Sequence, residues 1–128
     1  MRANKATIDL LTEYYSAMAT NDPSRYGAYY AEDMTLTFGN SPEVKGRENV
    51  LASFDILNRV RSNRHEFLGV WEEEGGLIIL ECVSIWELHN GSSVAFNALT
   101  LITMADGKFT DQRIYADIAP LLDALDRE

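Results

Sequence analysis

The chain has 128 residues, a length that fits one domain and allows a substantial core without disulfides or metal ions. Its 20 acidic and 11 basic residues give a net charge of −9, which repels phosphate groups, so neither nucleic acid nor an anionic membrane is an expected partner. The single cysteine, Cys82, cannot form an internal disulfide, and with no long apolar stretch in the chain it favours a soluble protein in the reducing cytoplasm.

The first half of the sequence predicts three helices and one strand. Residues 6–20 carry apolar side chains at three- and four-residue spacing, the pattern of an amphipathic helix. Asp22 can cap a second, short helix that has Pro23 at its first position. Residues 34–38 alternate between apolar side chains and threonine, which is typical of a half-buried strand, and a third helix is expected over residues 47–61.

The second half of the sequence predicts four long strands, over residues 64–74, 77–88, 94–105 and 108–116. The dipeptides between them are Gly75-Gly76, Asn90-Gly91 and Asp106-Gly107, which supply the positive φ of tight hairpin turns. We therefore expect an antiparallel meander. A short terminal helix or a tail over residues 118–125, with Pro120 near its start, should follow.

The order of these elements is similar to that of the nuclear transport factor 2-like superfamily. Three local patterns add to the resemblance: Asn21-Asp22 through Tyr30-Ala31-Glu32-Asp33, Lys45-Gly46-Arg47-Glu48, and Asp106-Gly107-Lys108-Phe109 followed by Arg113 to Asp117. The last resembles the final hairpin of SnoaL-like proteins and limonene epoxide hydrolases. The resemblance implies a single domain over residues 1–128 of the α+β class, a cone-shaped barrel with three helices packed on a curved antiparallel sheet and a small-molecule pocket inside.

Three enzyme patterns of this superfamily can be compared with the sequence. The ketosteroid isomerase tyrosine falls on Tyr14, but the aspartate base and acid fall on Phe38 and Leu99, which cannot transfer protons. Half of the catalytic residues of limonene epoxide hydrolases have no counterpart here, although the final-strand aspartate corresponds to Asp117 and the asparagine to Asn40. SnoaL-like cyclases rely on a pocket aspartate, and Asp117 is the residue that matches it.

Strand alternation adds further candidates. If Asp117 faces the pocket, Arg113 and Tyr115 do so as well, and we expect Glu81 and Asn97 to face it from neighbouring strands. One carboxylate would be ionised beside Arg113 and the other held protonated by desolvation, which provides a base and an acid. Alternatively, Glu81, Arg113 and Asp117 form a buried ion-pair network that only specifies the fold. A register slip of one residue would turn either carboxylate outward.

The predicted catalytic residues are therefore Asp117 as the principal acid/base, Glu81 as its partner and Arg113 as the group that sets their charges. His65 is either an acid/base at the pocket mouth or a half-exposed side chain paired with a carboxylate. The predicted substrate-binding residues are Asn40, Asn97, Tyr14, Phe38, Tyr115 and His65. The two histidines and the cysteine give no metal-ligand spacing, so no metal and no other cofactor is expected.

The sequence leaves three functions open. The first is a cofactor-independent, SnoaL-like enzyme that isomerises, cyclises or hydrates a small apolar organic molecule. The second is a non-catalytic module that binds a hydrophobic ligand, and the third is a domain that serves only association. If Ile85 faces the cavity, Trp86 faces outward, which favours a homodimer through the convex face of the sheet, as the resemblance also implies.

Overall fold

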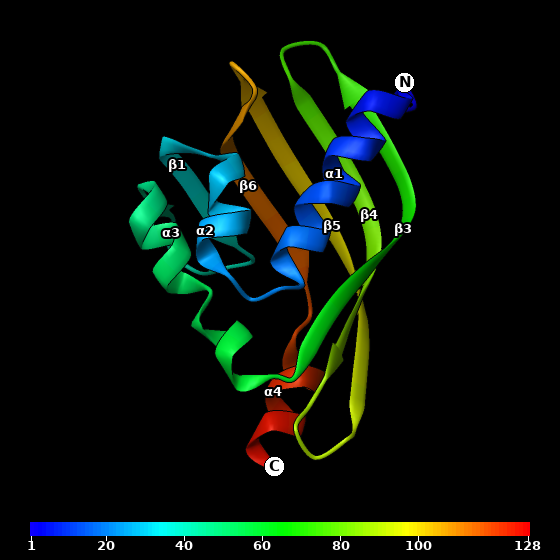
Figure 1. Cartoon of the computed structure of the whole chain (residues 1–128). Helices are drawn as coiled ribbons and strands as arrows, with labels where there is room; N and C mark the ends of the chain where they lie inside the picture. Colours follow the sequence, from blue (N-terminus) through cyan, green and yellow to red (C-terminus); the bar gives the residue numbers. More distant parts are fainter.

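The computed structural model describes all 128 residues, and Figure 1 shows its helices against one face of a curved sheet. The helices are α1 (Lys5–Met18), α2 (Pro23–Tyr26), α3 (Arg47–Ser53) and α4 (Ala119–Asp126), with short 3₁₀ helices η1 (Gly27–Tyr29) and η2 (Asp55–Arg59). The strands are β1 (Tyr30–Phe38), β2 (Val44–Lys45), β3 (Ser62–Glu73), β4 (Leu77–Glu87), β5 (Ser93–Ala105) and β6 (Lys108–Ala116). None of the helices is both long and apolar enough to cross a membrane. The α+β class is confirmed.

The sheet has the strand order β2-β1-β6-β5-β4-β3 and is not closed into a barrel. Strands β3 to β6 pair in sequence as the predicted antiparallel meander. The sheet is not antiparallel throughout, however, because β1 runs parallel to β6. We call the face that carries α1 the concave face and the opposite one the convex face.

The helix starts follow from local sequence. Asn4 caps α1 by accepting a hydrogen bond from the backbone N–H of Thr7 at 2.9 Å, and Asp22 caps α2 by accepting one from Ser24 at 3.0 Å. The predicted single helix over residues 47–61 is wrong, because α3 ends at Ser53 and η2 follows. The Ser53 hydroxyl donates to the carbonyl of Val50 at 2.6 Å, a local bond that competes with continued helix.

An aromatic cluster fixes α1 on the sheet. The ring centroids of Tyr14 and Phe109 are 4.9 Å apart in an edge-to-face arrangement, and both side chains are fully buried. The hydroxyl oxygens of Tyr14 and Tyr30 are 2.5 Å apart, so each buried phenol has a polar partner. This cluster fills one part of the concave face and leaves the remainder to a cavity.

The turn between β3 and β4 provides a matched pair of glycines. Gly75 and Gly76 both have a φ of +83°. A Cβ on Gly76 would lie 2.3 Å from the carbonyl oxygen of Met104, whereas a Cβ on Gly75 would meet nothing within 4 Å.

We therefore expect Gly75→Ala to lower the free energy of unfolding by about 1 kcal/mol, the cost of left-handed backbone alone. Gly76→Ala should lower it by about 3 kcal/mol, because the clash with Met104 adds to the same backbone cost. Urea denaturation of the two variants measures the difference. Equal losses would show that the turn relaxes freely away from Met104.

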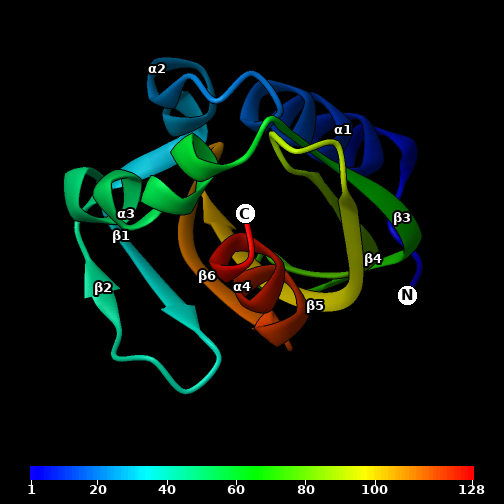
Figure 2. The same cartoon turned by 90° about the horizontal axis from the view of Figure 1, so that it is seen from below.

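The helix α4 lies across the open end of the curved sheet, as Figure 2 shows from below. Its side chains Leu121 and Leu125 are buried. Asp117 holds its first turn by accepting a hydrogen bond from the N–H of Ala119 at 3.0 Å. The space inside the sheet is therefore bounded by α1 on one side and by α4 at the end.

Candidate functional site

A cavity of about 310 Å³ lies between the concave face and the helices. Fifteen of its 22 lining residues are hydrophobic, and none is Asp, Glu, Lys or Arg. Its rim includes Ser41, Pro42 and Ser53, which are exposed to solvent. An apolar enclosure with a few neutral polar groups is typical of sites for small organic molecules.

A chain of three polar side chains follows the cavity wall across β3 and β4. The Oγ atom of Ser84 accepts a hydrogen bond from Nε1 of Trp86 at 2.7 Å and lies 3.1 Å from Nε2 of His65. Because an indole can only donate, the hydroxyl proton of Ser84 remains available for His65. Burial lowers the pKa of His65 to about 4, so the imidazole is uncharged at neutral pH.

Tyr15 extends from α1 across the concave face. Its ring lies against the ring of His65, at a centroid distance of 4.4 Å, and near that of Phe67, at 5.8 Å. Thr100 on β5 and Cys82 on β4 line the same cavity. Burial raises the pKa of Tyr15 well above its usual value, and burial together with Glu81 raises the pKa of Cys82 to about 11. Both groups therefore keep their protons at neutral pH.

Tyr14, which the isomerase resemblance selects, does not line the cavity. It is fully buried in the aromatic cluster, where its hydroxyl is paired with that of Tyr30. Burial is the main reason that the pKa of Tyr14 lies well above its usual value. The prediction that Tyr14 contacts the ligand is therefore not supported, and its neighbour Tyr15 occupies the cavity wall instead.

The three predicted catalytic residues do not face the cavity. Glu81, Arg113 and Asp117 are all exposed, and none is among the lining residues. Glu81 stands opposite Leu99 on the convex face. The prediction that these three side chains converge in one pocket is wrong.

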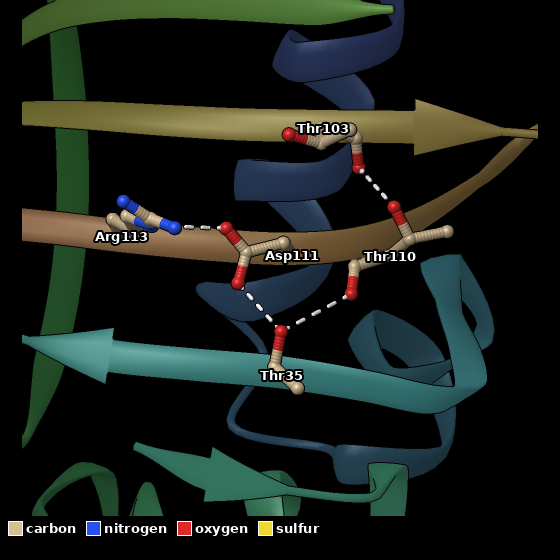
Figure 3. Close-up of polar contacts among 5 residues, drawn as sticks. All are labelled: Thr35, Thr103, Thr110, Asp111 and Arg113. Atoms are coloured by element: carbon tan, nitrogen blue, oxygen red, sulfur yellow. Dashed lines mark hydrogen bonds and ion pairs between the residues drawn. The ribbon is translucent and has the colours of Figure 1, made fainter. Parts of the chain in front are cut away.

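The partners of Arg113 confirm its outward position. Its Nε donates to Oδ2 of Asp111 at 3.2 Å, and Oδ1 of Asp111 accepts from the Thr35 hydroxyl at 2.5 Å. Figure 3 shows this row on the side of the sheet that faces away from α1, with Thr110 bonded to the carbonyl of Thr103 beside it. These contacts stabilise the pairing of β1, β6 and β5 and do not contribute to the cavity.

The predicted binding residues divide into two groups. Phe38 and His65 line the cavity. Asn40, Asn97 and Tyr115 are exposed and lie outside it, so the structure does not place them with a ligand. Sequence reasoning missed the polar wall residues Tyr15, Ser84, Trp86, Thr100 and Gln112.

The predicted site residues on the strands were misplaced for one reason: the wrong alternate set of side chains was assigned to the cavity side of the sheet. On β4 the residues that face the cavity are Cys82, Ser84 and Trp86, and the opposite set carries Glu81 and Glu87. Charged side chains are rarely buried without a partner, so the two glutamates on one face could have identified the solvent side. Trp86, expected to face outward, is 8% exposed and points inward.

No three His, Cys, Asp or Glu side chains lie close enough together to hold a metal ion. The only ionisable side chains on the cavity wall are those of Tyr15, His65 and Cys82. At neutral pH all three are uncharged, given the direction of their pKa shifts. The site can therefore offer hydrogen bonds and apolar contact, but no ion pair.

A model of the SnoaL-like domain matches residues 11–112 of the chain. No curated protein matches it significantly. Among solved structures, AclR, a proposed hydroxylase from Streptomyces galilaeus, superposes with a TM-score of 0.78 at 17% identity, over 98% of this chain and 84% of AclR. A proposed SnoaL-like polyketide cyclase from Shewanella denitrificans gives a TM-score of 0.77 at 14% identity, over 98% of this chain and 100% of that protein. TerC, crystallised with polyporic acid, gives a TM-score of 0.73 at 13% identity, over 93% of this chain and 97% of TerC.

Proposed function

Because the chain belongs to the SnoaL-like domain family and its inner cavity has no charged wall residue, we propose that it binds a small, uncharged, largely apolar organic molecule there. The composition of the cavity wall is the observation that carries this proposal. A charged ligand would lose its hydration without gaining an ion partner, which is costly in an apolar enclosure. An uncharged ligand would bury apolar surface against the wall at no such cost.

Structural neighbours support a small organic ligand. TerC was crystallised with polyporic acid, and the Shewanella denitrificans protein is a proposed polyketide cyclase. At 13% and 14% identity they are evidence for the fold alone. In this chain the fold leaves a cavity between the helices and the sheet. We do not propose acid/base catalysis by Glu81 and Asp117, because both carboxylates are exposed away from the cavity.

The test is to fill the cavity. Ala98 lines it from β5 and is 7% exposed, so Ala98→Phe would place a ring in the space that the ligand occupies. We expect wild-type protein to bind the uncharged fluorescent probe N-phenyl-1-naphthylamine and Ala98→Phe to bind it at least about tenfold more weakly, a loss of about 1.4 kcal/mol. Fluorescence titration gives both dissociation constants.

Ala95→Phe is the matched control, because Ala95 is on the same strand but exposed and outside the cavity. The same ring added there should leave the probe affinity unchanged. If wild-type protein does not bind the probe, or if both variants bind as well as the wild type, the cavity is not a binding site for such molecules.

We also propose that the chain forms a homodimer through the convex face. Leu99 and Tyr115 are neighbours in the β5–β6 register and are 40% and 48% exposed, which is high for large apolar side chains. The half-buried Val83 and Leu101 lie on the same face. A two-fold contact would cover these four apolar side chains on both copies at once.

Leu99→Glu should convert such a dimer to a monomer, because it would place a second carboxylate beside Glu81 in the middle of the contact. Leu122→Glu is the control, since Leu122 has the same 40% exposure but lies on α4. Analytical ultracentrifugation should give a dimer mass for the wild type and for Leu122→Glu. A monomeric wild type at about 100 μM would contradict the proposal, because specific interfaces of standard size have dissociation constants well below that concentration.

A further inference from the structure

Two residues of the cavity wall each have a buried polar atom without a hydrogen-bond partner. The atoms are Oε1 of Gln112 on β6 and Nδ1 of His65 on β3. The third such atom of the chain, Oδ1 of Asn63, belongs to a residue outside the wall. Leaving a buried polar atom unpartnered costs free energy, so folded proteins contain few of them. A molecule in the cavity is a source of the missing partners.

The side chain of Gln112 is on the concave side of the sheet. Its neighbours on β6, Asp111 and Arg113, lie on the side that faces away from α1 in Figure 3, and successive side chains of a strand alternate between faces. Gln112 is only 1% exposed and lines the cavity. The last torsion of a glutamine side chain is soft, so the amide can turn toward a group in the cavity.

The pairing of β6 explains why the protein leaves the amide oxygen of Gln112 without a donor. In the strand register, Gln112 stands between Leu36 on β1 and Ile102 on β5, whose side chains have no polar atom. The cavity wall also has no Lys or Arg that could donate to it. The donor therefore has to come from the content of the cavity.

Of the two unpartnered atoms, the oxygen of Gln112 selects the chemistry of the ligand more sharply. Nε2 of His65 lies 3.1 Å from Oγ of Ser84, and the roles of both ring nitrogens depend on the tautomer. Nδ1 donates if Ser84 gives its proton to Nε2, and it accepts in the other tautomer, so ligand groups of either kind can satisfy it. An amide oxygen can only accept, and it requires a donor.

We propose that Gln112 accepts a hydrogen bond from the bound molecule, and that this molecule is therefore an uncharged compound with a hydroxyl or N–H group. This inference rests on the proposed function, because it concerns a ligand in the same cavity. A neutral amide oxygen suits a neutral donor. A cationic donor would need a carboxylate to compensate for its lost hydration, and the wall has none.

Two probes of nearly the same shape test this. At neutral pH 4-phenylphenol is uncharged and carries a hydroxyl group where 4-methylbiphenyl carries a methyl group. The measured quantity is the ratio of the dissociation constant of 4-methylbiphenyl to that of 4-phenylphenol, obtained by displacement of N-phenyl-1-naphthylamine. In Gln112→Met this ratio should fall about three- to tenfold, the range for one net hydrogen bond, because sulfur is only a weak acceptor. Gln112→Leu, which removes the amide with a different shape, should show the same fall.

Asn97→Leu is the matched control, because it removes a side-chain amide that is exposed and outside the cavity. The ratio of the two dissociation constants should stay at its wild-type value in this variant. The comparison of one ratio between proteins also cancels the different hydration of the two probes in water.

A second readout needs no variant. Gln112 is the only glutamine of the chain, so wild-type protein labelled with ¹³C at the side-chain carbonyl of glutamine gives a single side-chain signal. This signal should move downfield when 4-phenylphenol binds, as carbonyl carbons do when their oxygen accepts a hydrogen bond. It should move less when 4-methylbiphenyl binds.

The outcomes separate this inference from the proposed function. If neither N-phenyl-1-naphthylamine nor the biphenyls bind wild-type protein, the proposed function fails, and the inference fails with it. If the biphenyls bind but both Gln112 variants keep the wild-type ratio, the cavity binds ligands and Gln112 is not the acceptor. Equal shifts of the ¹³C signal with the two probes would overturn the inference as well.

Discussion

Between pH 7 and pH 4, wild-type protein should lose about 3 kcal/mol more of its free energy of unfolding than the His65→Gln variant. Burial lowers the pKa of His65 to about 4 in the folded protein, whereas the usual pKa of a histidine side chain is about 6.5. The unfolded chain therefore takes up the proton first as the pH falls. The stability contributed by the neutral imidazole is complete above pH 6.5 and is lost as the pH falls towards 4.

Chemical denaturation at pH 7, 6, 5 and 4 measures this difference. Gln keeps a hydrogen-bonding group near Ser84 and does not titrate, so it is a suitable replacement. The lowered pKa values of Asp22 and Glu72 also reduce stability in acid, but both variants share them. Parallel stability profiles for the two proteins would show that His65 is not buried as a neutral ring.

Phe109→Ala should lower the free energy of unfolding by about 4 kcal/mol, near the middle of the range for a fully buried phenylalanine. The ring of Phe109 lies 4.9, 6.1 and 6.2 Å from the rings of Tyr14, Tyr29 and Tyr30, so its loss removes packing on three sides. The contact between α1 and β6 depends on this cluster, and α1 also carries the cavity residue Tyr15.

Leu68→Ala is the control for this variant, because Leu68 is 54% exposed and its loss should cost less than about 0.5 kcal/mol. Thermal and urea denaturation should place the two variants far apart. A loss below about 2 kcal/mol for Phe109→Ala would mean that the tyrosines close the space that the ring leaves, and that the cluster is not a rigid support for α1.

Most of the fold could be predicted because its signals are local. The dipeptides Gly75-Gly76, Asn90-Gly91 and Asp106-Gly107 lie at the three hairpin turns, and their glycines have positive φ. The parallel contact between β1 and β6 was not predictable in this way, because it joins residues far apart in the sequence. The end of α3 was missed since apolar spacing continues into η2, although the backbone leaves the α-helix at Phe54.

The candidate site was predicted less well because it depends on which face each strand turns inward. The strands β4 and β5 are apolar on both faces, so Val83 and Leu101 outside resemble Leu80 and Ile102 inside. A bulge in β6 adds to the difficulty, since the pairing shifts between Thr103 and Met104. Because Asp117 was assumed to face inward, every strand residue whose direction was inferred from it was assigned to the wrong face of the sheet.

A crystal structure of the protein with N-phenyl-1-naphthylamine bound would show directly whether the cavity is the binding site. We expect the probe between α1 and the concave face, against Ala98 and Trp86, with Glu81 and Asp117 remaining in solvent. A probe bound over Leu99 and Tyr115 on the convex face, with an empty cavity, would show that the cavity is not the binding site.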